Sequence, residues 1–136
     1  MKLEQHLVFN IPPKPASRPR VTRFGTYYSK TYTNYKKDMQ QLIDKMRIDK
    51  YYGLIRVSMK FYMPIPKAVS KKKRLEMDGL YCDVGGDIDN LQKAVYDALN
   101  TIAWSDDKQI VSIGKIDKVY SVNPRTEITV EEIFMR

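Results

Sequence analysis

The chain has 136 residues, the size of one ordinary domain, and its 24 Lys and Arg against 16 Asp and Glu give a formal charge of +8. Such an excess of positive charge favours a polyanionic partner, either nucleic acid or an anionic membrane surface. The sequence shows no apolar run of membrane-spanning length and no signal-peptide pattern, so we expect a soluble intracellular protein that does not act at a membrane.

The first half of the chain alternates between strand and helix patterns. Residues 5–11 place apolar side chains at every second position, as a half-buried strand does. Apolar residues then recur at helical spacing, which predicts a helix from residue 33 or 34 to residue 46. Strict alternation over residues 55–63 predicts a second strand, and Ser70 is expected to cap a short helix over residues 70–76.

The second half contains one further helix pattern and two strand patterns. Apolar spacing predicts a helix over residues 90–101, and enrichment in Ile and Val predicts a strand over 108–119. A last strand over 127–133, with Ile128 and Val130 directed inward, is expected to pair with the preceding strand as a hairpin. The element order indicates a single α+β domain, residues 1–136, with a mixed sheet covered by helices.

Two basic segments are candidates for contact with phosphate. Residues 14–37 contain no acid and interleave bases with tyrosines, so we expect a loop with a short hairpin around Gly25. Residues 71–74 are four consecutive bases. Either segment could simply be a solvated surface, but the acid-free run favours DNA binding. The predicted DNA-binding residues are Lys14, Arg18, Arg20, Arg23, Lys71, Lys72, Lys73 and Arg74.

Carboxylates stand at both ends of the helix expected at 90–101. Asp87 and Asp89 come where its pattern begins, and Asp106 and Asp107 follow its far end. Clustered carboxylates repel one another, and a divalent cation makes such a cluster tolerable. The sequence therefore predicts a metal site, provided that folding returns the later pair toward the start of the helix.

The composition narrows the kind of metal. The chain has one cysteine, Cys82, and one histidine, His6, which excludes an internal disulfide and a structural zinc site. A bound metal is then expected to be a hard cation held by oxygen, such as Mg²⁺.

Lys93 lies four residues after Asp89, on the same face of the expected helix. Its ammonium could neutralise part of the acid charge, hold a phosphate or stabilise negative charge in a transition state, and Asp97 could pair with it. The same residues also have a purely structural interpretation. Asp89 with Gln92 fits a capping box, while Asp106 and Asp107 could be turn residues beside a core tryptophan.

Three stretches resemble the signature of the RusA family of Holliday junction resolvases, found in bacteria and bacteriophages. They are Asp-Ile-Asp-Asn-Leu-Gln-Lys at 87–93, Tyr-Asp-Ala-Leu at 96–99 and Trp-Ser-Asp-Asp-Lys-Gln-Ile-Val at 104–111. The resemblance implies a homodimeric crossover junction endodeoxyribonuclease of mixed α/β fold, active in DNA recombination and repair. It further implies dependence on Mg²⁺, for which Mn²⁺ is expected to substitute, paired nicks in four-way DNA, and no small-molecule cofactor.

Carried over residue by residue, the resemblance makes Asp87, Asp89 and Asp107 the metal ligands and Lys93 the essential base. Asp106 would be an accessory to this set. Residues 82–86 lack the base or proline that the family tends to place before its first aspartate, which makes Asp83 an alternative ligand.

The resemblance also implies a location in the cytoplasm of a bacterial cell, with the gene carried by the host or by a bacteriophage. Two other functions fit the same residues. One is a non-catalytic DNA-binding or replication-accessory protein, and the other is a nuclease for other branched or flapped DNA.

Overall fold

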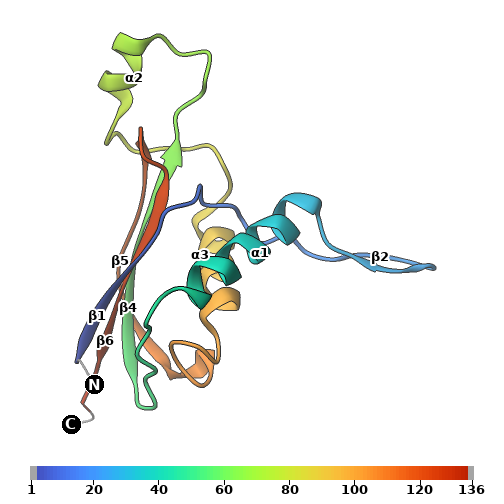
Figure 1. Cartoon of the computed structure of the whole chain (residues 1–136), viewed down its shortest axis with the longest axis vertical. Helices are drawn as coiled ribbons and strands as arrows, with labels where there is room; N and C mark the ends of the chain where they lie inside the picture. Colours follow the sequence, from blue (N-terminus) through green and yellow to red (C-terminus); the bar gives the residue numbers. More distant parts are fainter. Residues whose placement is uncertain (1–2, 135–136) are drawn as a thin grey trace.

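The computed structural model describes residues 3–134, which build a four-stranded mixed sheet with α1 and α3 on one face (Figure 1). Strands β4 and β5 are parallel, and the other neighbouring pairs are antiparallel. The order across the sheet is β1 (Glu4–Phe9), β6 (Arg125–Glu132), β4 (Ile55–Pro64) and β5 (Ile110–Ser121). This is the predicted α+β class with a mixed sheet covered by helices. Of the predicted domain 1–136, residues 1–2 and 135–136 lie outside the described part.

Alternation along the strands builds the core. In β4 every second residue is buried, so one face of the strand packs under the helices and the other stays accessible. Ile128 and Val130 of β6 have no exposed surface, which confirms their predicted inward direction. The three strands predicted over 5–11, 55–63 and 108–119 are all present, with ends shifted by one or two residues.

The helices begin at serine or aspartate caps. Helix α1 (Lys30–Asp44) starts earlier than predicted, because Ser29 rather than residue 33 or 34 is its cap and accepts a hydrogen bond from the Tyr32 amide at 3.2 Å. Helix α2 (Lys71–Met77) is capped by Ser70 as predicted. Helix α3 (Ile88–Leu99) begins at Asp87, and its buried residues lie against the sheet.

The predicted hairpin between the last two strands is wrong. Strand β6 pairs with β1 and β4, and β5 pairs with β4 instead. The link 122–124 therefore passes over the end of β4, which lies between the two strands. An alternating pattern fixes which face of a strand is buried, but it does not choose the strand's neighbour.

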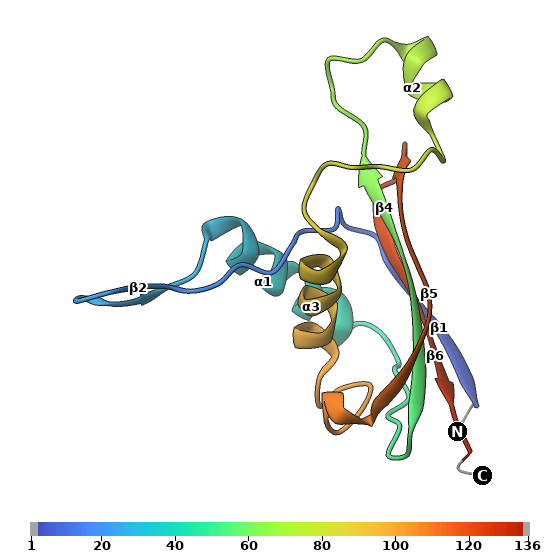
Figure 2. The ribbon, with the colours of Figure 1, turned by 180° about the vertical axis from the view of Figure 1, so that it is seen from behind.

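Two segments leave the main body. The predicted hairpin around Gly25 is present as β2 (Arg20–Thr22) and β3 (Gly25–Tyr27), and it projects sideways as an arm (Figure 2). Between β4 and β5 the chain runs through α2, α3 and the 3₁₀ helix η1 (Asp107–Gln109). This crossover, residues 65–109, carries most of the candidate site.

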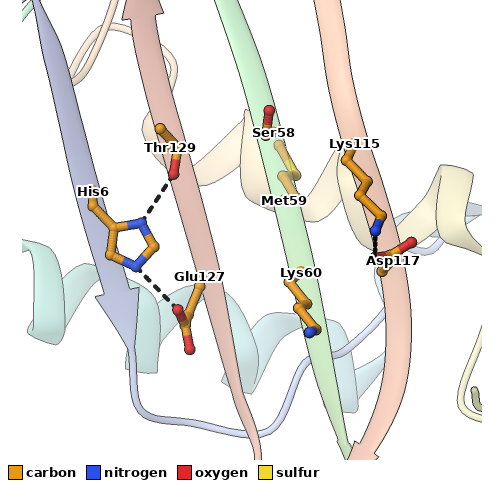
Figure 3. A pocket seen from close by; sticks show the side chains of 8 residues that line it. All are labelled: His6, Ser58, Met59, Lys60, Lys115, Asp117, Glu127 and Thr129. Atoms are coloured by element: carbon orange, nitrogen blue, oxygen red, sulfur yellow. Dashed lines mark hydrogen bonds and ion pairs between the residues drawn. The ribbon is translucent and has the colours of Figure 1, made fainter. Parts of the chain in front are cut away.

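The face of the sheet away from the helices is polar. Figure 3 shows its side chains on all four strands, with the ring of His6 lying 3.0 Å from Thr129 and 3.0 Å from Glu127. Lys115 and Asp117 form an ion pair of 3.4 Å on β5. Among residues 3–134, no helix is both long and apolar enough to cross a membrane.

Candidate functional site

The first turn of α3 presents the two predicted aspartates to solvent. Asp87 is the N-cap residue with extended backbone, yet its side chain makes no capping hydrogen bond. Asp89 lies in the first turn, so the predicted capping box of Asp89 and Gln92 is wrong. Gln92 instead donates from Nε2 to the hydroxyl of Tyr96 at 2.5 Å. Both carboxylates are exposed and remain free for a role other than capping.

The loop before Asp87 is held tightly on one side. Gly85 and Gly86 have φ angles of +88° and +107°, and a Cβ on Gly86 would lie 2.8 Å from the ring of Pro15. The glycine pair therefore allows the loop to pass close to the N-terminal segment.

Sequence reasoning missed Lys118, which fixes the same loop from β5. Its side chain is 7% exposed, and Nζ donates to the carbonyl of Gly86 at 2.6 Å. Its own backbone carbonyl accepts a hydrogen bond from the Cys82 amide at 3.0 Å. Lys118 also lines a pocket of about 410 Å³ together with Asp87 and Asp117. The signal in the sequence is a lysine at an inward position of a strand, where an unpaired ammonium is costly.

Lys93 lies one turn after Asp89 and is held by a short chain of contacts. Its Nζ is 3.8 Å from Oδ1 of Asp97, which confirms the predicted pair. Oδ2 of Asp97 accepts a hydrogen bond of 2.5 Å from the hydroxyl of Tyr32 on α1. Burial raises the pKa of Tyr32, and the hydrogen bond to Asp97 raises it further, so the phenol keeps its proton and Asp97 stays an acceptor.

The two later acids have different surroundings. Asp106 caps η1, because its carboxylate accepts from the Lys108 amide at 2.8 Å and Gln109 bonds back to the Asp106 amide. Asp107 accepts a hydrogen bond of 2.7 Å from the indole Nε1 of Trp104, which is fully buried as predicted. Asp106 therefore has a structural task, and Asp107 is the acid fixed to the core.

Asp107 lies toward the second half of α3 rather than its start. Asp107 lies near enough to Tyr96, in the second half of the helix, for its negative charge to act on that phenol. Burial raises the pKa of Tyr96, the hydrogen bond from Gln92 lowers it, and the charge of Asp107 raises it further. Figure 2 shows the segment after α3 at the end of that helix opposite to the loop that leads into it. A helix of 12 residues is about 18 Å long.

The three predicted ligands do not form one cluster. Within residues 3–134 no three or more side chains of His, Cys, Asp and Glu are grouped so as to hold a metal. Asp83, the alternative ligand, is exposed in the loop before Asp87. Mg²⁺ is often held by only one or two carboxylates, with phosphate oxygens and water completing its shell, so a site of that kind would need no acid beyond Asp87 and Asp89.

The predicted DNA-binding residues divide between two places. Arg20 and Arg23 are exposed on the arm, Arg18 is exposed in the segment that leads into it, and Lys14 is half-buried at its root. The four bases of residues 71–74 belong to α2, beyond the end of the sheet (Figure 1). One of them, Arg74, donates to the carbonyl of Pro66 at 3.1 Å.

Two comparisons place the chain among known proteins. A family model described as "Endodeoxyribonuclease RusA" matches residues 10–131. The chain is also 39% identical over 85 residues to the "Uncharacterized protein YqaN" of Bacillus subtilis (strain 168). That match covers 60% of this chain and 59% of the relative, so the chain spans about three fifths of the curated protein's length.

Proposed function

Because the chain belongs to the RusA family of endodeoxyribonucleases, we propose that it resolves four-way DNA junctions by paired, symmetric nicks. Two cuts related by two-fold symmetry are made most directly by a C2 homodimer with one site in each subunit. We also propose, from the family, that the protein acts in recombination and repair in the cytoplasm of a bacterial cell, with the gene in the host or in a bacteriophage.

One contact carries the proposal. The Ala16 amide donates to the carbonyl of Asn90 at 2.9 Å, which fastens the start of the basic segment to the first turn of α3. The start of α3, which presents Asp87 and Asp89 and, one turn later, Lys93, therefore lies beside the root of the arm. Acids that suit a metal and bases that suit phosphate come together there, as phosphodiester cleavage requires.

We assign Asp87 and Asp89 as the residues that hold Mg²⁺ or Mn²⁺ together with the DNA phosphate. Asp107 is the proposed third acid and Lys93 the proposed essential base. The metal would supply a bound water of lowered pKa and would stabilise the charge that develops on the phosphate. The residues of the chain would bind and orient the DNA strand. The ion pair with Asp97 would position Lys93 for this task.

The two basic groups suit two separate parts of a branched substrate. The arm projects sideways from the helices, whereas α2 lies past the end of the sheet (Figure 1). Contacts of this kind neutralise phosphates and release counterions, so binding should weaken steeply with salt.

The test uses the purified full chain and a synthetic four-way junction, with a linear duplex of the same sequence as control. We expect symmetric nicks in the junction with Mg²⁺ or Mn²⁺, none with a chelator, and much slower cutting of the duplex. A duplex cut as fast as the junction would refute the structure-specific part of the proposal.

A non-catalytic DNA-binding or replication-accessory protein is the second candidate. The separation of Asp107 from the Asp87 and Asp89 pair favours it, since the described residues contain no three-acid cluster. Junction binding with no metal-dependent nicking in the same assay would select this function. Faster cutting of flapped or other branched DNA would instead select a nuclease for those substrates.

A further inference from the structure

A pocket of about 380 Å³ lies between the segment 16–19, the start of α1 and one side of α3. Its volume falls in the range of small-molecule sites. Three cations line it from three elements, together with two tyrosines and one acid. These residues are Arg18, Lys36, Lys93, Tyr28, Tyr32 and Asp97.

The single acid of this set is already engaged. One oxygen of Asp97 accepts from Tyr32 and the other faces Lys93. No ion pair within residues 3–134 involves Arg18 or Lys36. The pocket therefore keeps a surplus of positive charge, which suits an anionic ligand.

The aromatic side of the pocket is ordered and partly open. The rings of Tyr28 and Tyr32 meet edge to face, with centroids 6.3 Å apart. The ammonium of Lys36 lies 5.0 Å from the Tyr28 centroid and 5.1 Å from that of Tyr32. Tyr32 is buried, whereas Tyr28 is 50% exposed and offers a ring surface next to the cations. Proteins that bind single-stranded DNA use this arrangement: the base stacks on an aromatic ring and the phosphate contacts the neighbouring positive charge.

We propose that this pocket binds one nucleotide of the cleaved DNA strand, with its phosphate among Arg18, Lys36 and Lys93 and its base against Tyr28. The assignment rests on the proposed function, because it takes DNA as the ligand. It gives Lys36 and Tyr28 individual roles, where the sequence indicated only a general DNA contact by residues 14–37.

The pocket also explains how the strand reaches the acids. Lys93 belongs to the pocket and lies one helical turn, about 5.4 Å, beyond Asp89 on the same face of α3. A nucleotide held at Lys93 thus directs the adjoining phosphate toward Asp89 and Asp87. The pocket would set which bond of the strand lies at the site.

The test compares two neighbouring lysines of α1. Lys36→Met removes the charge in the pocket, and Lys37→Met removes the same charge from an exposed residue that does not line it. We expect Lys36→Met to weaken junction binding about tenfold at ~0.1 M salt and to lower the salt slope by about one. Lys37→Met should lie near wild type, and Lys36→Arg should restore binding. Equal effects of the two Met variants would overturn the proposal.

A second readout does not depend on cleavage. Deoxythymidine 5′-monophosphate should shift the amide resonances of Ser17, Tyr28 and Asn90 in the full chain, and Lys36→Met should abolish these shifts. Equal shifts with inorganic phosphate alone, or unchanged affinity in Tyr28→Leu, would refute the base contact. If the protein binds the nucleotide but never cuts junctions, the proposed nuclease function is refuted and the proposed nucleotide pocket stands. If both Met variants cut junctions equally well, the nuclease function stands and the nucleotide pocket is refuted.

Discussion

Trp104 donates a hydrogen bond of 2.7 Å from its indole Nε1 to Oδ1 of Asp107. The indole ring is fully buried and meets Tyr96 edge to face, with centroids 6.0 Å apart. Asp107 is therefore anchored to the core of the protein. Asp106, its neighbour, is occupied as the cap of η1.

Replacement of each acid by asparagine should separate these tasks. Asp107→Asn should abolish junction cleavage and preserve or strengthen junction binding, because it removes a negative charge from a protein that binds a polyanion but keeps an acceptor for Trp104. Asp106→Asn should keep cleavage and cost at most about 1 kcal/mol of stability, since Asn is also a good cap. Gel assays of nicking and binding give the comparison, and emission from the single tryptophan reports whether its surroundings are unchanged. If Asp107→Asn retains cleavage, Asp107 is not the third acid that the cleavage reaction requires.

Lys118→Met should impair the site from a distance. It removes the ammonium that donates to the Gly86 carbonyl at 2.6 Å, next to Asp87. The unpaired carbonyl costs about 1–3 kcal/mol of stability, and the loosened loop should slow cleavage about tenfold. Lys115→Met on the same strand is the control, because its side chain is 79% exposed. Urea unfolding and single-turnover cleavage measure the two effects, and identical behaviour of the two variants would remove Lys118 from the support of Asp87.

Gly86→Ala should destabilise the protein more than Gly79→Ala. Both glycines have positive φ, so both substitutions strain the backbone. Only at Gly86 does the added methyl meet a neighbour, Pro15 at 2.8 Å, whereas nothing lies within 4 Å at Gly79. We expect an extra loss of about 1–3 kcal/mol at Gly86 in urea unfolding, together with slower cleavage. Equal losses would show that the N-terminal segment moves aside freely.

Glu127 should stabilise the fold at neutral pH and cease to do so in acid. Burial alone would raise its pKa, but hydrogen bonds from Arg125 and His6 bring the pKa below the ordinary value of 4.5. A carboxyl with a lowered pKa contributes stability above its unfolded pKa and loses it as the pH falls through the folded value. Glu127→Gln should therefore lower the melting temperature at pH 7, and the difference from wild type should shrink below about pH 4.5. A difference that stays constant down to pH 3 would contradict this account.

The parts of the fold that the sequence predicted are those with a local cause. Alternation identified β1, β4 and β6, and helical spacing identified α1 and α3, because each pattern follows from the geometry of one element. The cap of α1 was missed by several residues, since serine, threonine and asparagine all fit and only the folded chain selects Ser29.

The contacts that shape the site join distant parts of the chain. Tyr32 and Asp97 are 65 positions apart, and Lys118 reaches Gly86 across 32 positions. Short motifs marked Asp87, Asp89 and Lys93, but no local pattern relates them to β5 or α1. The roles assigned to the acids and to Lys93 stay predictions until the variants are measured.

The parallel pairing of β4 and β5 also governs when the site can exist during folding. These strands are neighbours, yet the chain between them, residues 65–109, includes Asp87, Asp89, Lys93 and Asp107. Closing so long a loop costs entropy before any contact between the strands repays it, so this pairing should form late. A partly folded chain would then carry basic segments able to hold DNA before it could cut, and cleavage would begin only in molecules that have completed their sheet.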